Sequence, residues 1–129
     1  MLRLEDLSCG YGKIEAVSRL SLEVGKESIV ALIGANGAGK SSTIQCIAGH
    51  VQRTEGRILF DGEDISALSP QQRVRRGIAV APEGRRLFRD LTVRENLTMG
   101  GFCRPRQREK ANFERVMEIF PRLDRKSVV

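Results

Sequence analysis

One stretch of this sequence carries residue types at a spacing suited to phosphate chemistry. Residues Gly34 to Ser41 match the pattern Gly-x-x-x-x-Gly-Lys-Ser/Thr in full. Glycines let such a loop take conformations closed to other residues, so that successive backbone N–H groups converge on a phosphate. Lys40 adds a charge for the β- and γ-phosphates, and Ser41 adds a hydroxyl that can ligate Mg²⁺. The stretch predicts a phosphate-binding loop whose candidate residues are Gly34, Ala35, Asn36, Gly37, Ala38, Gly39, Lys40, Ser41 and Ser42.

Such a loop needs a buried strand before it and a helix after it. Ile29 to Ile33 is an uninterrupted apolar run, which is typical of a strand buried on both faces of a parallel sheet. Lys40 to Ala48 predicts the helix, closed by Gly49 as its C-terminal cap, with Ile44 and Ile47 on its buried side. The start of a helix offers unpaired amides and a positive dipole end, so this placement favours anion binding.

Apolar periodicity and turn residues predict the other strands. They are a short edge strand through Leu2, Leu4 and Leu7, a partner strand from Val17 to Val24, a strand from Arg57 to Phe60 that ends at an Asp61–Gly62 turn, and a short strand from Ile78 to Ala81. Because only a turn separates the first two, we expect them to pair antiparallel.

Capping residues predict the other helices. They run from the N-cap Ser69 through Pro70 to Gly77, from the capping box of Thr92 and Glu95 to Gly100–Gly101, and from about Gln107 to Phe120. The last helix places Phe113, Val116, Met117 and Phe120 on one stripe. That stripe predicts the buried side of the helix.

Length and composition limit the class of protein. The chain has 129 residues, of which 40% are hydrophobic and 29% charged, as in a single folded domain with a modest core. No apolar run is long enough to span a bilayer, and charged residues interrupt Met1 to Leu7, so we expect neither a membrane span nor a signal peptide. Three separated cysteines and the single histidine, His50, fit neither a disulfide framework nor a zinc site, which favours a reducing cytosol.

The positive charge lies in the second half of the chain. Residues 1 to 64 hold seven Lys/Arg against nine Asp/Glu, whereas residues 65 to 129 hold fifteen against seven. A basic half is compatible with nucleic acid, an anionic membrane surface or acidic ligands. The basic run comprises Arg104, Arg106, Arg108 and Lys110, and it has no interleaved aromatic residues for stacking on bases. We interpret this run as a solvated face and expect no nucleic-acid partner.

The only tyrosine, Tyr11, stands between Gly10 and Gly12 at the turn joining the first two strands. A ring between two glycines is poorly placed for the core. It is either a purine-stacking platform beside the phosphate loop or a plain turn aromatic.

Together, these segments resemble the ATP-binding subunits of ABC transporters, in particular those of branched-chain amino-acid importers. The resemblance covers Leu2 to Leu123 and rests on Tyr11, Gly34 to Ser41, Gly56 to Ile65, Ala81 to Phe88 and Leu91 to Leu97. It implies an α/β P-loop NTPase fold, of which residues 1–129 form the N-terminal part. That part would hold an antiparallel β lobe packed on an incomplete parallel core and the start of the helical lobe.

The resemblance also implies roles for individual residues. Tyr11 would stack on adenine, and Ser41 and Glu83 would ligate Mg²⁺, so the implied cofactors are ATP and Mg²⁺. Glu83 stands where most of the family has glutamine, and it resembles the variant usual in the branched-chain branch. The alternative for Glu83 is an exposed loop carboxylate beside Arg85 and Arg86.

The sequence contains no match to the family's Leu-Ser-Gly-Gly signature, to the Asp-Glu of its second nucleotide motif or to its switch histidine. We therefore assign no catalytic residue within this chain and expect ATP binding without appreciable turnover. The implied partners are membrane permease subunits and a second ATP-binding subunit, at the cytoplasmic face of the cell membrane. The alternative is a truncated relic that binds ATP and supports neither hydrolysis nor transport. A nucleotide kinase has less support, because no lid-like arginine cluster pairs with an acceptor pocket.

Overall fold

The computed structural model describes residues 1–84, 86–103 and 106–126. The chain divides into two compact units, Met1–Val80 and Ala81–Val129, and each is described separately. Arg85, beside Glu83, and Arg104, in the basic run, lie outside the described residues.

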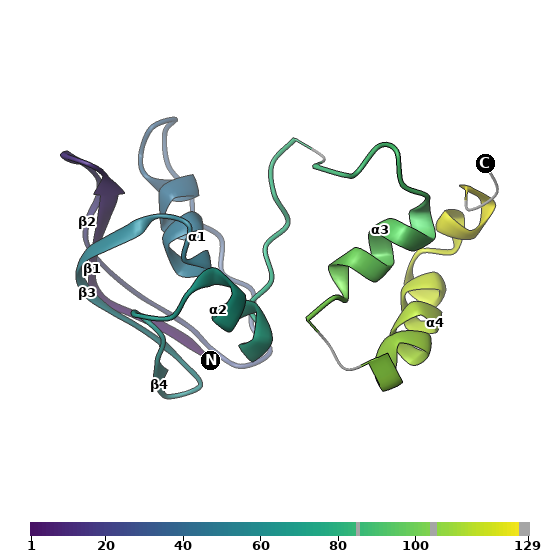
Figure 1. Cartoon of the computed structure of the whole chain (residues 1–129). Coiled ribbons are helices and arrows are strands. Elements are labelled where there is room, and N and C mark those ends of the chain that lie inside the picture. The colour runs from purple at the N-terminus through teal and green to yellow at the C-terminus, as the bar shows by residue number, and fades with distance from the viewer. Residues whose placement is uncertain (85, 104–105, 127–129) are drawn as a thin grey trace. The chain divides into compact units, whose positions relative to one another are not determined.

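The first unit contains a four-stranded antiparallel sheet with the strand order β2-β1-β3-β4 (Figure 1). Its strands are β1 (Leu2–Tyr11), β2 (Ile14–Val24), β3 (Gln52–Phe60) and β4 (Glu63–Asp64). The predicted pairing of the first two strands is confirmed. The prediction that the first strand lies at an edge is wrong, because β1 pairs with β2 on one side and β3 on the other.

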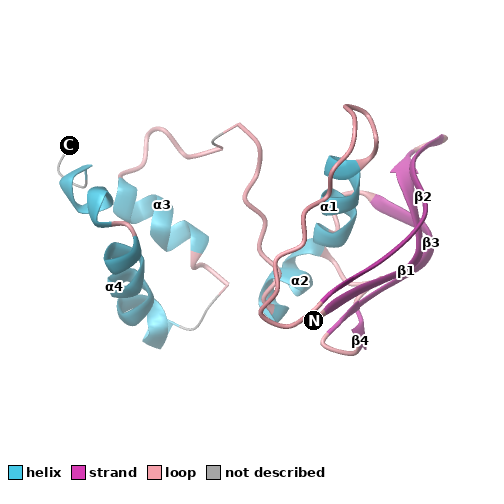
Figure 2. Ribbon diagram, turned by 180° about the vertical axis from the view of Figure 1, so that it is seen from behind, coloured by secondary structure: helices cyan, strands magenta, loops and turns pink. Residues whose placement is uncertain are grey.

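Two helices, α1 (Lys40–Ala48) and α2 (Pro70–Arg76), lie against one face of this sheet (Figures 1 and 2). The predicted bounds of α1 and its Gly49 cap are confirmed. The core that forms between sheet and helices consists of Leu4, Leu7, Cys9, Cys46, Ile47, Val51, Ile58 and Ile65. Ile47 is buried as predicted, whereas Ile44 is 41% exposed, so its predicted burial is wrong. Thr43, Cys46 and Ala48 are the residues buried beside Ile47, which places Ile44 off that face.

The predicted parallel strand at residues 29–33 and the predicted short strand at residues 78–81 do not form in this structure. Neither segment pairs as a strand, and Ile29 and Ile33 are 99% and 94% exposed. A strand buried on both faces needs neighbouring strands and a layer on either side. Among the described residues, every strand belongs to the antiparallel sheet, so this apolar run has no strand to pair with.

The second unit holds α3 (Val93–Gly100) and α4 (Glu109–Ile119), with 3₁₀ turns at Arg106–Arg108 and Pro121–Lys126. The predicted capping box is confirmed, since Thr92 Oγ1 accepts from Glu95 N and Glu95 accepts from Thr92 N. The last helix begins two residues later than predicted, after the 3₁₀ turn. Phe113, Val116 and Met117 are half-buried, but Phe120 is 58% exposed, so the predicted stripe is one residue shorter.

Candidate phosphate-binding site

The candidate loop lies directly before α1, and Gly39 is the N-cap of that helix. Gly37 and Gly39 have φ angles of 85° and 84°, which L residues rarely adopt. A Cβ at position 39 would lie 2.5 Å from the carbonyl oxygen of Ala16 in β2. The loop therefore passes so close to the sheet that only glycine fits at position 39.

Lys40 folds back over the loop. Its Nζ donates hydrogen bonds to the carbonyl oxygens of Gly34, at 2.8 Å, and Ala35, at 2.6 Å. The Ala35 oxygen also accepts from the backbone N–H of Ala38, at 3.2 Å, which closes the turn of the loop. An ammonium group has three donors, and a phosphate oxygen is a stronger, charged acceptor than a carbonyl. The ammonium group is thus held in the loop, where an anion can compete for it.

The first turn of α1 presents a positive helix end. No acidic side chain lies in this turn, so nothing in the helix itself offsets its N-terminal dipole charge. Ser41 is exposed and Ser42 is half-buried. Thr43 faces inward, and its Oγ1 donates to the carbonyl oxygen of Gly39 at 2.9 Å, which ties the helix to the N-cap.

A cavity of about 290 Å³ adjoins the loop, between β2 and the start of α1. Val17 and Leu20 line it from the sheet, and Ala38, Lys40 and Thr43 line it from the loop and helix. This volume is at the lower end of the range for small-molecule pockets. The site thus combines an apolar wall from the sheet with a cationic group from the loop.

Tyr11 is the last residue of β1, and its side chain is 55% exposed. The expectation that this ring stays out of the core is confirmed. Its role in adenine stacking stays a prediction.

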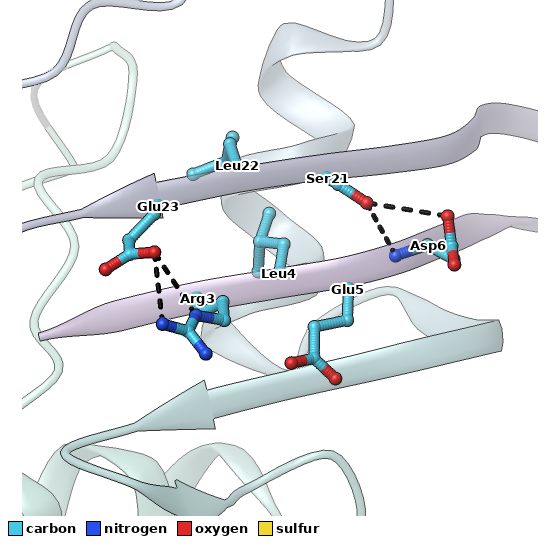
Figure 3. Close-up of a pocket in the computed structure, with 7 residues that line it drawn as sticks. All are labelled: Arg3, Leu4, Glu5, Asp6, Ser21, Leu22 and Glu23. Carbon is cyan, nitrogen blue, oxygen red and sulfur yellow. Dashed lines mark hydrogen bonds and ion pairs between the residues drawn. The ribbon is translucent and has the colours of Figure 1, made fainter.

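A larger cavity of about 530 Å³ lies against β1 and β2, and Figure 3 shows its lining. Its polar groups bond to one another. Arg3 pairs with Glu23 at 3.2 Å, and Ser21 Oγ accepts from the backbone N–H of Asp6 at 2.9 Å. Because these side chains already have partners and carry mainly negative charge, this cavity is unsuited to a phosphate.

Glu83 is exposed and belongs to the second unit, whereas Ser41 belongs to the first. A joint Mg²⁺ site of these two residues therefore stays a prediction. Within the described ranges, no three His, Cys, Asp or Glu residues cluster as a metal site would require. A serine hydroxyl at a phosphate loop fits Mg²⁺, since that ion is usually held by few protein oxygens together with phosphate oxygens.

Two features of the site had no clear signal in the sequence. Thr43 is a polar residue on the buried face of α1, and Arg73 is buried beneath the same helix although its neighbours Arg75 and Arg76 are exposed.

Cys46 of α1 packs against Cys9 of β1. Burial, followed by the neighbouring Cys9, raises the pKa of Cys46 to about 12, so this thiol stays protonated.

No helix in the described parts of the chain is long and apolar enough to cross a membrane.

The chain matches a known family over most of its length. A family model described as ABC transporter covers residues 17–129, a range that includes the whole phosphate loop and α1. The chain belongs to this family. The resemblance noted in the sequence is therefore confirmed.

Two curated relatives illustrate the range of similar proteins. The chain is 46% identical to the high-affinity branched-chain amino acid transport ATP-binding protein BraG of Pseudomonas aeruginosa, over 95% of this chain and 53% of that relative. It is 44% identical to the lipopolysaccharide export system ATP-binding protein LptB of Haemophilus influenzae, over 75% of this chain and 40% of that relative. The chain thus spans about half the length of these relatives, or less.

A solved structure of the ATP-binding subunit of an ABC transporter matches with a TM-score of 0.81 and 31% identity. The match covers 97% of this chain and 52% of that one. The predicted fold class, the N-terminal part of an ABC ATPase fold, is confirmed by this similarity. In the described part of the chain the antiparallel β lobe is formed, whereas strands of a parallel core are not.

Proposed function

We propose that this chain binds Mg-ATP as the phosphate-loop half of the nucleotide-binding domain of an ABC transporter, comprising residues 1–129. The observation that carries this proposal is the position of Lys40. Its ammonium group lies within a glycine-rich loop at the positive end of α1, bonded to two carbonyl oxygens that a phosphate can displace.

Each residue of the site would have a distinct task. The loop amides and Lys40 would hold the phosphates, and the ring of Tyr11 would stack on the adenine. Ser41, together with Glu83, would ligate Mg²⁺. When bound, the metal ion would neutralise charge on the phosphate oxygens. This assignment is consistent with the exposed positions of Tyr11, Ser41 and Glu83.

We further propose that the transporter imports branched-chain amino acids. The 46% identity to BraG over nearly the whole chain supports this substrate class. The relative LptB serves export of lipopolysaccharide, so an export system is the competing assignment. In either case the partners would be permease subunits and a second ATP-binding subunit at the cytoplasmic face of the membrane. Co-purification with the permease subunits of an amino-acid importer or of a lipopolysaccharide exporter would distinguish the two assignments.

Titration calorimetry with Mg-ATP tests the nucleotide site. Lys40→Ala removes a charge-assisted contact worth about 1.5 to 3 kcal/mol, so its affinity should fall more than tenfold. Lys26→Ala is the matched control, because Lys26 is an exposed lysine outside the loop. Equal affinity for Mg-ATP in the parent and in Lys40→Ala would contradict the proposal.

The same titration tests the role of Tyr11. Tyr11→Phe keeps an aromatic face and should bind Mg-ATP like the parent, whereas Tyr11→Ala should lose about 1 to 3 kcal/mol of binding free energy. If the alanine variant binds as well as the parent, Tyr11 is a turn aromatic only.

A further inference from the structure

The C-terminal end of α1, opposite the phosphate loop, is held by a side chain from another helix. The last carbonyl groups of a helix lack partners within it, and α1 has no basic residue in its last turn. The backbone N–H of Gly49 donates to the carbonyl oxygen of Cys46, and Arg73 of α2 adds further donors and a positive charge at this end. Its Nη1 donates to the carbonyl oxygens of Cys46, at 2.7 Å, and Ile47, at 2.8 Å.

The same guanidinium group also binds the segment that leads into α2. Nε donates to the carbonyl oxygen of Leu68 at 3.0 Å, and Nη2 donates to that of Ser66 at 2.9 Å. Arg73 is only 3% exposed, and burial lowers its pKa. A buried charge is costly unless it is hydrogen-bonded, and here four carbonyl oxygens accept from the three nitrogens of the guanidinium group. The planar guanidinium group of Arg73 therefore hydrogen-bonds at the same time to the end of α1 and to the segment before α2.

The backbone around Arg73 is shaped to admit it. Gly49, the cap of α1, has a φ of 86°, and a Cβ there would lie 3.3 Å from Arg73 Nε and 3.3 Å from the Pro70 backbone nitrogen. Glycine at position 49 both ends the helix and leaves room for the guanidinium group. Arg73 thus occupies a fitted position beneath α1.

Both ends of α1 are consequently fixed. At the N-terminal end Gly39 lies close against Ala16 of β2, and at the C-terminal end Arg73 donates hydrogen bonds to the last carbonyl oxygens of α1. The nine residues between them span about 13 Å at roughly 1.5 Å per residue. A short helix fixed at both ends cannot tilt or slide without breaking one of these contacts.

We propose that Arg73 is a positioning residue for nucleotide binding. It touches no phosphate. By fixing the far end of α1, it keeps the loop amides and Lys40 in the geometry that binds Mg-ATP. This inference rests on the proposed function, and it adds a coupling between the phosphate loop and the segment from Leu68 to Arg73.

Amide hydrogen exchange on the unaltered chain tests the coupling without any substitution. Mg-ATP should slow exchange in residues 34–43 and also at Gly49 and His50, whose amides donate to carbonyl oxygens at the far end of α1, and at Arg73, whose amide donates to the Ser69 carbonyl oxygen at the start of α2. Protection confined to residues 34–43 would overturn the inference and leave the proposed function intact. If Mg-ATP protects no residues, both are overturned.

Substitutions then assign the coupling to the guanidinium group. Arg73→Lys keeps the charge but replaces the planar fork of five N–H donors with one ammonium group that has three, and Arg73→Gln removes the charge. Both should raise the Kd for Mg-ATP about 3- to 30-fold at a temperature where the variants remain folded by circular dichroism. Arg75→Gln, on the exposed side of the same helix, is the matched control and should bind like the parent.

Chemical rescue separates positioning from a general loss of stability. In Arg73→Ala, millimolar guanidinium should restore part of the affinity for Mg-ATP, whereas sodium chloride at equal ionic strength should not. Unchanged affinity in folded Arg73→Lys and Arg73→Gln, with a parent that binds Mg-ATP, would overturn the inference. Should these variants fail to fold, the exchange experiment on the unaltered chain decides.

Discussion

The two sides of the phosphate loop differ sharply in burial. Before the loop, Ile29 to Ile33 is the most apolar run of the chain, yet Ile29 is 99% exposed and Ile33 94% exposed. After the loop, the more polar helix α1 buries Thr43, Cys46, Ile47 and Ala48. The apolar segment before the loop is exposed, and the helix after it, which has both polar and apolar residues, forms part of the core. Burial therefore follows the availability of a partner surface more closely than it follows hydrophobicity.

The partner surfaces explain this difference. The helix meets β1 through Cys9 and Cys46, and it meets α2 through Arg73. The apolar run of residues 29–33, before the loop, is typical of a strand that needs neighbouring strands. No strand in the described part of the chain pairs with it. Among the described residues, the loop is supported by α1 and by the close approach of Gly39 to β2.

The strongest test of the comparison uses one isoleucine from each side of the loop. Ile47→Ala should lower the free energy of unfolding by about 2 to 5 kcal/mol, because the side chain leaves a cavity in the core. Ile33→Ala should change it by less than about 0.5 kcal/mol, since Ile33 is almost fully exposed. Urea unfolding followed by circular dichroism measures both. Similar losses in the two variants would show that residues 29–33 are buried in solution.

A second test compares two loop glycines that share a left-handed backbone. A Cβ at position 39 would lie 2.5 Å from the Ala16 carbonyl oxygen, whereas one at position 37 would meet no atom within 4 Å. Gly39→Ala should therefore cost about 1 to 3 kcal/mol more than Gly37→Ala in the free energy of unfolding. The same urea titration measures the difference. Equal costs would mean that the loop does not press on β2.

The smallest expected effect concerns the ion pair between Arg76 of α2 and Glu63 of β4. Helix α2 is the helix that supports α1. Hydrogen bonds from Arg76, at 2.6 and 2.7 Å, hold the pKa of the Glu63 carboxyl below its usual range. A carboxyl pKa that is lower in the folded state stabilises the protein above the unfolded pKa, and this contribution is lost as the pH falls through the folded pKa. The urea midpoint should thus decline below about pH 5, and less steeply in Glu63→Gln. Identical pH profiles would rule out a contribution from this pair.

Local signals in the sequence predicted the helices well. Thr92 with Glu95, and Ser69 with Pro70, form their caps from residues three positions apart or fewer, so their geometry depends little on the rest of the chain. The phosphate loop is equally local. Its glycines and Lys40 lie within eight residues, and the structure confirms both the helix that follows and its Gly49 cap.

Features that depend on distant residues were predicted less well. The sequence predicted an edge strand at Leu2 to Leu7, whereas β1 also pairs with β3. That pairing joins residues more than forty positions apart, so no local pattern could predict it. Ile44 looked buried from helical periodicity, but the position of β1 decides which face of α1 is covered. Arg73 had no signal at all, since its role depends on carbonyl oxygens of Cys46 and Ile47.

The three cysteines differ enough in their surroundings to serve as chemical reporters. Cys103 is exposed, whereas Cys9 and Cys46 are buried with raised pKa values. Because the thiolate is the form that reacts, a maleimide dye should label Cys103 first. The chain contains no tryptophan, so such a dye would give the second unit a fluorescent signal of its own. Slow labelling of the other two thiols would then report how often the sheet and α1 separate.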